Sequence, residues 1–298
     1  MQITPATIAG LQAGFNKQFQ KAFDKAESFS EPLVTLVPVT SKKEVFGFMD
    51  RIPKMRKSVG ERQFENLVSR AVEIEVDKYF GDIEVDADDI EDDNLGIYAS
   101  RIDMMGMQAK KWPDQLFIEA VQAGATKLAY DGQYFFDTDH PVNMDDPASA
   151  VQANKFTSKS LTKANYAEVR ATMMSYKGVD GQPLGVRPNL LVVPPALEDA
   201  GRTILNAEFI AQGETNTMKG TADLLVIPEL ANEATTWYLL ATSWPIRPFV
   251  FVRRSVPVMR SLDASSEHLI LKDKYVLSTK ARGAVGYGPW FLAAKATA

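Results

Sequence analysis

Apolar residues near the N-terminus recur at intervals of three or four positions. They are Ile8, Leu11, Phe15, Phe19, Phe23 and Ala26. Thr4-Pro5 precedes them as a typical helix start, and the pattern predicts an amphipathic helix of about five turns. Its apolar stripe needs a partner, which could be its own domain or a neighbouring copy of the chain. The sequence leaves both possibilities open.

Strict alternation of apolar and polar residues follows at residues 72–77, where Val72, Ile74 and Val76 share one face. This pattern is typical of a half-exposed strand. A second short alternation at residues 82–86 extends it. The region from about 33 to 90 is therefore predicted to form an extended, charged β-arm with little core of its own. Because isolated hairpins are marginally stable in water, we expect this arm to lie on another surface.

The longest helical pattern covers residues 98–128, and Pro113 inside it predicts a kink or a restart. Asp131-Gly132 predicts a turn, and Tyr134-Phe135-Phe136 predicts a short strand after it. Another helix is predicted from Thr162 to Tyr176, with Tyr166, Val169, Met173 and Tyr176 facing inward. The remainder is rich in strands, predicted at residues 190–193, 224–227, 237–241, 249–252, 275–279 and 285–292. Helices and strands mix without regular βαβ alternation, so the predicted class is α+β.

Composition narrows the possible functions. A chain of 298 residues with 45% hydrophobic residues can bury a substantial core, and the absence of cysteine excludes disulfides and thiolate metal sites. No secretory leader pattern and no run of roughly 20 apolar residues is present, so we expect a soluble, unexported chain without a membrane role. The formal net charge of -5 opposes tight binding to duplex DNA. The net charge therefore fits a protein that encloses nucleic acid better than one that binds it tightly.

Charge is concentrated in two blocks. Residues 42–62 are mainly basic, whereas residues 82–93 carry eight carboxylates and no positive side chain. Two solvated faces would explain these blocks. Electrostatic complementarity between copies of the chain would also explain them. The candidate interface residues are Phe15, Phe19, Phe23, Arg51, Lys54, Arg56, Lys57, Asp88, Asp89, Asp92 and Asp93.

Candidate catalytic chemistry is sparse. His140 lies near Asp137 and Asp139, a combination that could bind a divalent cation or perform acid/base chemistry. The alternative, which we favour, is that these aspartates are turn formers that cap local backbone amides. The other histidine, His268, has no nucleophile motif near it. The glycines at 283, 286 and 288 lack the dinucleotide-binding spacing and instead indicate close approach of strands.

Several motifs in the chain resemble one known family. The most specific is residues 130–141, Tyr-Asp-Gly-Gln-Tyr-Phe-Phe-Asp-Thr-Asp-His-Pro. Supporting stretches are residues 59–62, residues 90–98, Trp112-Pro113-Asp114 and residues 286–290. Together they resemble the major head subunit family of Mu-like phages and prophages over most of the chain.

The resemblance implies an HK97-like major capsid fold. Its expected parts are an N-terminal arm helix (1–32), a β-arm called the E-loop (33–95), a peripheral domain with a long spine helix (96–154), an axial domain (155–235) and return strands of the peripheral domain (236–298). The segment 77–86 is more acidic than is typical of the family there. The strand pairing of the arm is therefore left open.

The function that the resemblance implies is assembly rather than catalysis. Copies would form pentamers and hexamers of an icosahedral head around double-stranded DNA, assembled in the bacterial cytoplasm with scaffold and portal proteins. It brings no catalytic residue, metal or cofactor, and it leaves cross-linking through Lys42 or Lys43 unsupported. Two alternatives remain: a metal-dependent enzyme centred on Asp137, Asp139 and His140, and another head or tail component that oligomerises.

Overall fold

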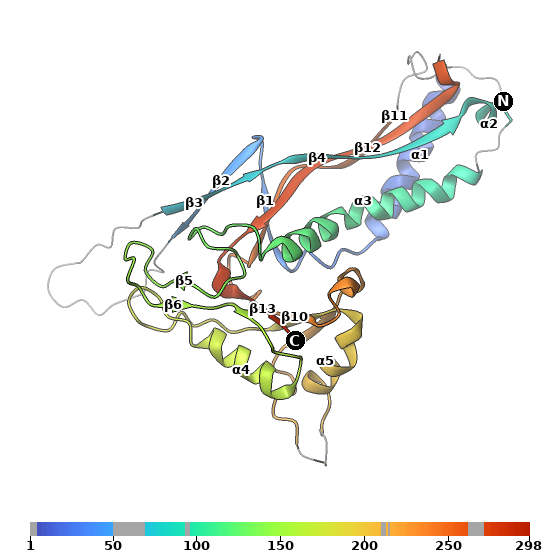
Figure 1. Ribbon diagram of the computed structural model, residues 1–298. Coiled ribbons are helices and arrows are strands. Elements are labelled where there is room, and N and C mark those ends of the chain that lie inside the picture. The colour runs from blue at the N-terminus through green and yellow to red at the C-terminus, as the bar shows by residue number, and fades with distance from the viewer. Residues whose placement is uncertain (1–4, 50–68, 93–95, 210–212, 214, 262–270) are drawn as a thin grey trace.

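A computed structural model describes residues 5–49, 69–92, 96–209, 213, 215–261 and 271–298. The molecule has a long, narrow part built on one sheet and a broader part built on a second sheet (Figure 1). Helices and strands are mixed in both parts, so the predicted α+β class is confirmed. Within the described segments, no helix combines the length and apolar character needed to cross a membrane.

The long sheet has four strands in the order β1-β11-β12-β4. Its strands are β1 (Val34–Pro38), β11 (Phe249–Ser261), β12 (Lys274–Tyr287) and β4 (Asp77–Asp86). β11 and β12 form an antiparallel hairpin, β4 pairs with β12, and β1 runs parallel to β11. The strands predicted at 275–279 and 285–292 belong largely to the single strand β12. The chain leaves β12 at Tyr287 because Gly288-Pro289 leads into the 3-10 turn η4 (Trp290–Leu292).

Helix α3 (Gly96–Ala123) lies along the long sheet, and α1 (Pro5–Lys25) packs on α3 (Figure 1). The helix continues through Pro113, so the predicted restart does not occur. Residues on both sides of the proline are buried in the core, including Trp112, Leu116 and Phe117. Their burial outweighs the one hydrogen bond that a proline removes.

The contact between α1 and α3 depends on Gly106. A Cβ atom at this position would lie 2.6 Å from the carbonyl oxygen of Phe19 and 3.0 Å from Cβ of Ala22. Phe19 is buried, and Phe15 and Phe23 pack against the same apolar cluster. The N-terminal stripe therefore packs on its own chain, which is one of the two possibilities that the sequence left open.

The predicted β-arm over residues 33–95 is too long. Within the described residues, β2 (Lys43–Met49) and β3 (Ser69–Glu75) pair with each other and not with the long sheet (Figure 1). The base of this hairpin still packs on that sheet, because Ile74 shares a buried cluster with Val250 and Val252 of β11. β1 and β4 are strands of that sheet, and Val34 and Val85 on them are buried. Their side chains fill the core, so these strands cannot belong to a free excursion. The short helix α2 (Ala87–Glu91) follows β4.

The second sheet has five strands in the order β7-β13-β10-β8-β9. Its strands are β7 (Lys155–Phe156), β13 (Ala293–Thr297), β10 (Thr236–Leu240), β8 (Leu190–Val193) and β9 (Asp223–Val226). Every residue of β10 is buried, as expected for a central strand. Residues 236–298 therefore do not all return to the long sheet as predicted, because β10 and β13 belong to the second one.

The described part of the chain also contains two further helices and three 3-10 turns. They are α4 (Lys163–Met174), α5 (Glu198–Leu205), η1 (Pro195–Leu197), η3 (Pro228–Glu233) and η4. Thr162 caps α4, and its side chain accepts a hydrogen bond from the amide of Asn165 at 3.2 Å. Tyr166, Val169 and Met173 are buried as the helical pattern predicts. They join one large core that extends from α3 to both sheets.

We expect Gly106→Ala to lower the free energy of unfolding by about 1–3 kcal/mol, because the added methyl group would collide with the backbone of α1. Gly10→Ala is the matched control, since no atom lies within 4 Å of a Cβ there. The control should gain up to about 1 kcal/mol from helix propensity. Urea unfolding of both variants measures the difference. Equal stabilities would contradict the proposed close contact.

Candidate functional site

The segment between α3 and α4 carries the most specific sequence motif. Asp131-Gly132 forms the predicted turn, with Gly132 at a φ of +84°. Tyr134-Phe135-Phe136 does not form the predicted strand, apart from a single bridge between Leu128 and Tyr134. Phe135 and Phe136 are both fully buried, whereas consecutive residues of a strand point to opposite faces. The two rings anchor this segment in the core.

His140, in the short strand β5 (His140–Pro141), has a buried carboxylate partner. Its Nδ1 lies 2.6 Å from Oδ2 of Asp131, and both side chains are fully buried. Its ring stacks on that of Trp290, with ring centroids 4.0 Å apart and planes inclined by 5°. The histidine therefore joins the turn after α3 to the η4 turn before β13.

Asn154 completes this buried cluster. Its side-chain nitrogen donates hydrogen bonds to the carbonyl oxygens of Phe135 at 2.7 Å and Trp290 at 3.2 Å. These two bonds turn its oxygen toward the amide of Asp137 at 2.9 Å and Nε2 of His140 at 3.2 Å. Sequence reasoning missed Asn154 because it lies between β6 (Val151–Gln152) and β7, where no periodic pattern marks it.

The carboxylates near His140 do not gather around one point. Asp137 accepts hydrogen bonds from the amides of Thr138 at 2.8 Å and Tyr134 at 3.3 Å. Asp139 is exposed. Among the described residues, no group of three or more acidic or histidine side chains has a geometry that could hold a metal ion. The interpretation of Asp137 as a turn-capping residue is confirmed, and the geometry gives the metal-site alternative no support.

The predicted interface residues lie in different environments. Arg51, Lys54, Arg56, Lys57 and Asp93 fall outside the described residues, as does His268. Asp88 and Asp92 are exposed at α2. Asp89 accepts a hydrogen bond from the hydroxyl of Tyr98. Burial and this bond raise the pKa of the Tyr98 phenol, so Asp89 already serves to attach α2 to α3.

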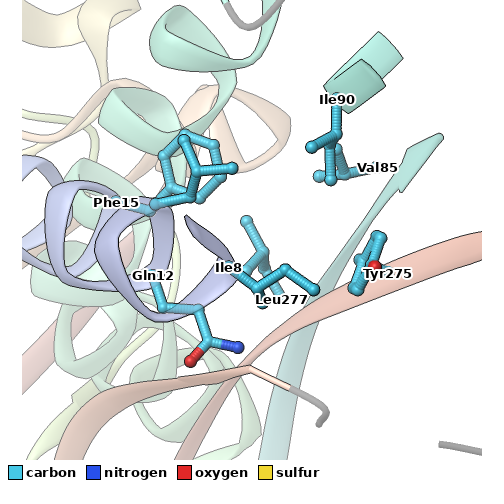
Figure 2. A pocket seen from close by; sticks show the side chains of 8 residues that line it. Ile8, Gln12, Phe15, Val85, Ile90, Tyr275 and Leu277 are labelled. Carbon is cyan, nitrogen blue, oxygen red and sulfur yellow. The ribbon is translucent and has the colours of Figure 1, made fainter. Parts of the chain in front are cut away.

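A small apolar cavity lies where α1 meets the far end of the long sheet (Figure 2). Its volume is about 20 Å³. The side chains around it include Ile8, Phe15, Val85, Ile90 and Leu277 (Figure 2). A space of this size is close to that of one water molecule, so it is a packing gap rather than a ligand site.

The exposed hairpin of β2 and β3 carries ion pairs between its own strands. Lys42 lies 2.7 Å from Glu75, and Lys43 pairs with Glu73. The Lys42 ammonium lowers the pKa of Glu75, and Glu73 raises the pKa of Lys43. The positive charges of these two lysines, which begin the basic block, are therefore paired with carboxylates of the same hairpin.

Comparison with known proteins gives matches along almost the whole chain. The model of the family described as Mu-like prophage major head subunit gpT matches residues 8–160, 156–230 and 229–298. The chain is 27% identical to the major capsid protein of Escherichia phage Mu, over 76% of this chain and 99% of that protein. It is also 27% identical to the Mu-like prophage FluMu major head subunit of Haemophilus influenzae, over 98% of this chain and 73% of that protein.

A solved structure extends the likeness to three dimensions. A chain in the procapsid of bacteriophage JBD30 aligns with a TM-score of 0.64 at 27% identity, over 99% of this chain and 76% of that chain.

We expect Asn154→Ala to lower the free energy of unfolding by about 3 kcal/mol or more, because several buried polar groups would lose their partner at once. Exposed Asp139→Asn should change it by less than about 0.5 kcal/mol. Urea unfolding with and without a chelator tests both statements. A large effect of Asp139→Asn, or a chelator-dependent midpoint, would favour a metal site instead.

Proposed function

The chain belongs to the family of Mu-like prophage major head subunits, and from this premise we propose how its copies build a head. It is a structural capsid protein with an HK97-like fold, not an enzyme. Our proposal is that copies meet head to tail in pentamers and hexamers. Head-to-tail contacts close into rings when the rotation between neighbours permits. These rings would tile an icosahedral shell around double-stranded DNA.

We assign the parts of the subunit as follows. The β2–β3 hairpin with the residues between its strands would be the E-loop, and α3 would be the spine helix. The long sheet with α3 would form the peripheral domain. The five-stranded sheet with α4 and α5 would form the axial domain at the ring centre. Residues 1–32 would be the N-terminal arm, docked on its own α3 in the subunit described here.

The observation that carries the proposal is the separation of the two charge blocks. The hairpin that flanks residues 50–68 joins β4 at Asp77, whereas α2 with its carboxylates follows the other end of β4 at Asp86 (Figure 1). A strand of this length spans roughly 30 Å. The acidic end of one copy is therefore remote from the base of its own hairpin, and a second copy can bring the two together.

Charge supports this contact between copies. Asp88 and Asp92 are exposed at α2. We propose that they pair with basic groups such as Arg56 and Lys57 of a neighbouring copy. Exposed pairs are individually weak, at about 0–1 kcal/mol. Because the same pairs recur between all neighbours in a ring, their summed free energy is considerable. Their complementary charges also favour one relative orientation of the copies. The stripe of Phe15, Phe19 and Phe23 stays a predicted interface only for an arm that leaves its own α3.

Further partners are part of the same proposal. Scaffold and portal proteins would take part in assembly in the bacterial cytoplasm. The finished head would enclose DNA without sequence-specific contacts. The net charge of -5 agrees with enclosure, since tight binding to duplex DNA requires clustered basic residues.

We expect the double charge reversal Arg56→Glu with Lys57→Glu to leave a folded subunit that no longer forms shells. Circular dichroism checks the fold, and electron microscopy of the expressed protein checks assembly. The matched control adds Asp88→Lys and Asp92→Lys to the same chain, which should restore particles by exchanging the charges. Normal particles from the first variant would contradict the proposed pairing.

A further inference from the structure

A groove runs along one face of α1, on the side where this helix meets α3. Its volume is about 580 Å³. It follows α1 from Gly14 to Ala26, a distance of about 18 Å along a helix. The opposite wall includes Met107 of α3. The small side chains of Ala22 and Ala26 leave the space open between the two helices.

Three lysines form a row along this groove. Lys17, Lys21 and Lys25 follow one another at intervals of four residues, and all three are exposed. Like charges at this spacing repel each other on a helix. Among the described residues, no carboxylate forms an ion pair with any of the three. Asp103 carries the single negative charge of the described lining, so the groove is positive in a chain whose net charge is -5.

The groove also offers an apolar contact. Met107 is 44% exposed, and a methionine side chain adapts readily to different partners because it is flexible and polarizable. The alanines beside it allow another backbone to come close. The stems of the lysines are apolar as well, although their ammonium groups reach water. An apolar strip beside a row of positive charges matches an amphipathic helix that carries carboxylates on its polar face.

Duplex DNA fits these features less well. Its non-specific affinity grows with the number of phosphates that basic side chains neutralise, and a row of three lysines neutralises few of them. The phosphates would also gain nothing from the exposed Met107.

A second copy of this chain does not supply the matching helix either. Of the described helices, none carries carboxylates one turn apart over three turns. α2 presents Asp88 and, at its C-cap, Asp92, but it is only 5 residues long. A helix with the required acidic row therefore comes from a different protein.

We propose that this groove docks an acidic amphipathic helix of a second, different protein. A helix of about 12 residues would span it. Carboxylates one turn apart would lie opposite Lys17, Lys21 and Lys25, and apolar side chains would cover Met107. One subunit carries the whole groove, so the inference does not rest on the proposed contacts between copies.

The test uses a fluorescein-labelled synthetic helical peptide with glutamate at every fourth position beside a row of leucines. Fluorescence anisotropy measures its affinity for the full-length chain, below the concentration at which particles sediment. A matched peptide with glutamine in place of each glutamate reports the apolar contact alone. The wild-type chain should bind the glutamate peptide roughly tenfold more tightly, the summed effect of three exposed charge pairs.

Lys21→Glu separates docking from folding. It places a negative charge between Lys17 and Lys25, so attraction replaces repulsion within α1 and the urea midpoint should stay unchanged or rise. The dissociation constant of the glutamate peptide should nevertheless rise roughly tenfold, whereas that of the glutamine peptide should not change. Lys127→Glu is the matched control, because Lys127 is exposed beyond the end of α3 and does not line the groove. It should leave both constants at their wild-type values.

Met107→Gln tests the apolar contact. It should weaken binding of both peptides by a similar factor. Because Met107 is partly exposed, the urea midpoint should scarcely change.

Equal affinity of the wild type for the two peptides, or unchanged binding by Lys21→Glu, would overturn the docking site and leave the lysines as a solvated face. Two further probes test the other occupants: a random-sequence DNA duplex and a peptide of residues 82–93 of this chain. Suppose that one of them binds more tightly than the glutamate peptide and loses its affinity in Lys21→Glu. The occupant is then nucleic acid or a second copy, and the proposal is wrong.

Discussion

Packing of α3 against the buried face of β12 holds the molecule together. The N-terminal half of the helix places Tyr98 and Ile102 in the smaller core with α1, and the C-terminal half places Trp112 and Phe117 in the large core. Because one helix enters both cores, it connects the far end of the long sheet to the five-stranded sheet. Loss of this contact would separate the two cores rather than loosen one of them.

Glycines make that packing possible. At Gly283 a Cβ atom would lie 2.8 Å from the Trp112 ring and 2.9 Å from the carbonyl oxygen of Val252. The hydroxyl of Tyr287, further along β12, donates a hydrogen bond to the carbonyl oxygen of Ala120 at 2.8 Å. Helix and strand are thus joined by contact of the Trp112 ring with the backbone at Gly283 and by a directed hydrogen bond further along. The sequence prediction that the glycines near 283–288 mark close approach is confirmed here.

The side chains in this chain that could perform chemistry instead join segments of the fold to one another. The pair of Asp131 and His140, held by Asn154 and Trp290, fixes the turn after α3 to the η4 turn. Asp89 fixes α2 to Tyr98. A subunit whose function is to be one part of a wall needs rigid connections more than a reactive centre. The exposed face of the β2–β3 hairpin and the exposed carboxylates at α2 remain open, and they are the parts expected to meet other copies.

Local pattern was enough to predict α1, α4, the buried strand β8 and the family, because periodicity and short motifs are properties of neighbouring residues. Local pattern failed where contacts between segments distant in the sequence decide which sheet a strand joins or whether a side chain is buried. β1 and β4 were assigned to the arm, although pairing with β11 and β12 makes them part of the sheet. Phe135 and Phe136 read as a strand, although core contacts draw both rings inward. The role of Asn154 follows only from tertiary structure, since its partner Trp290 is distant in the sequence and no local signal marks it.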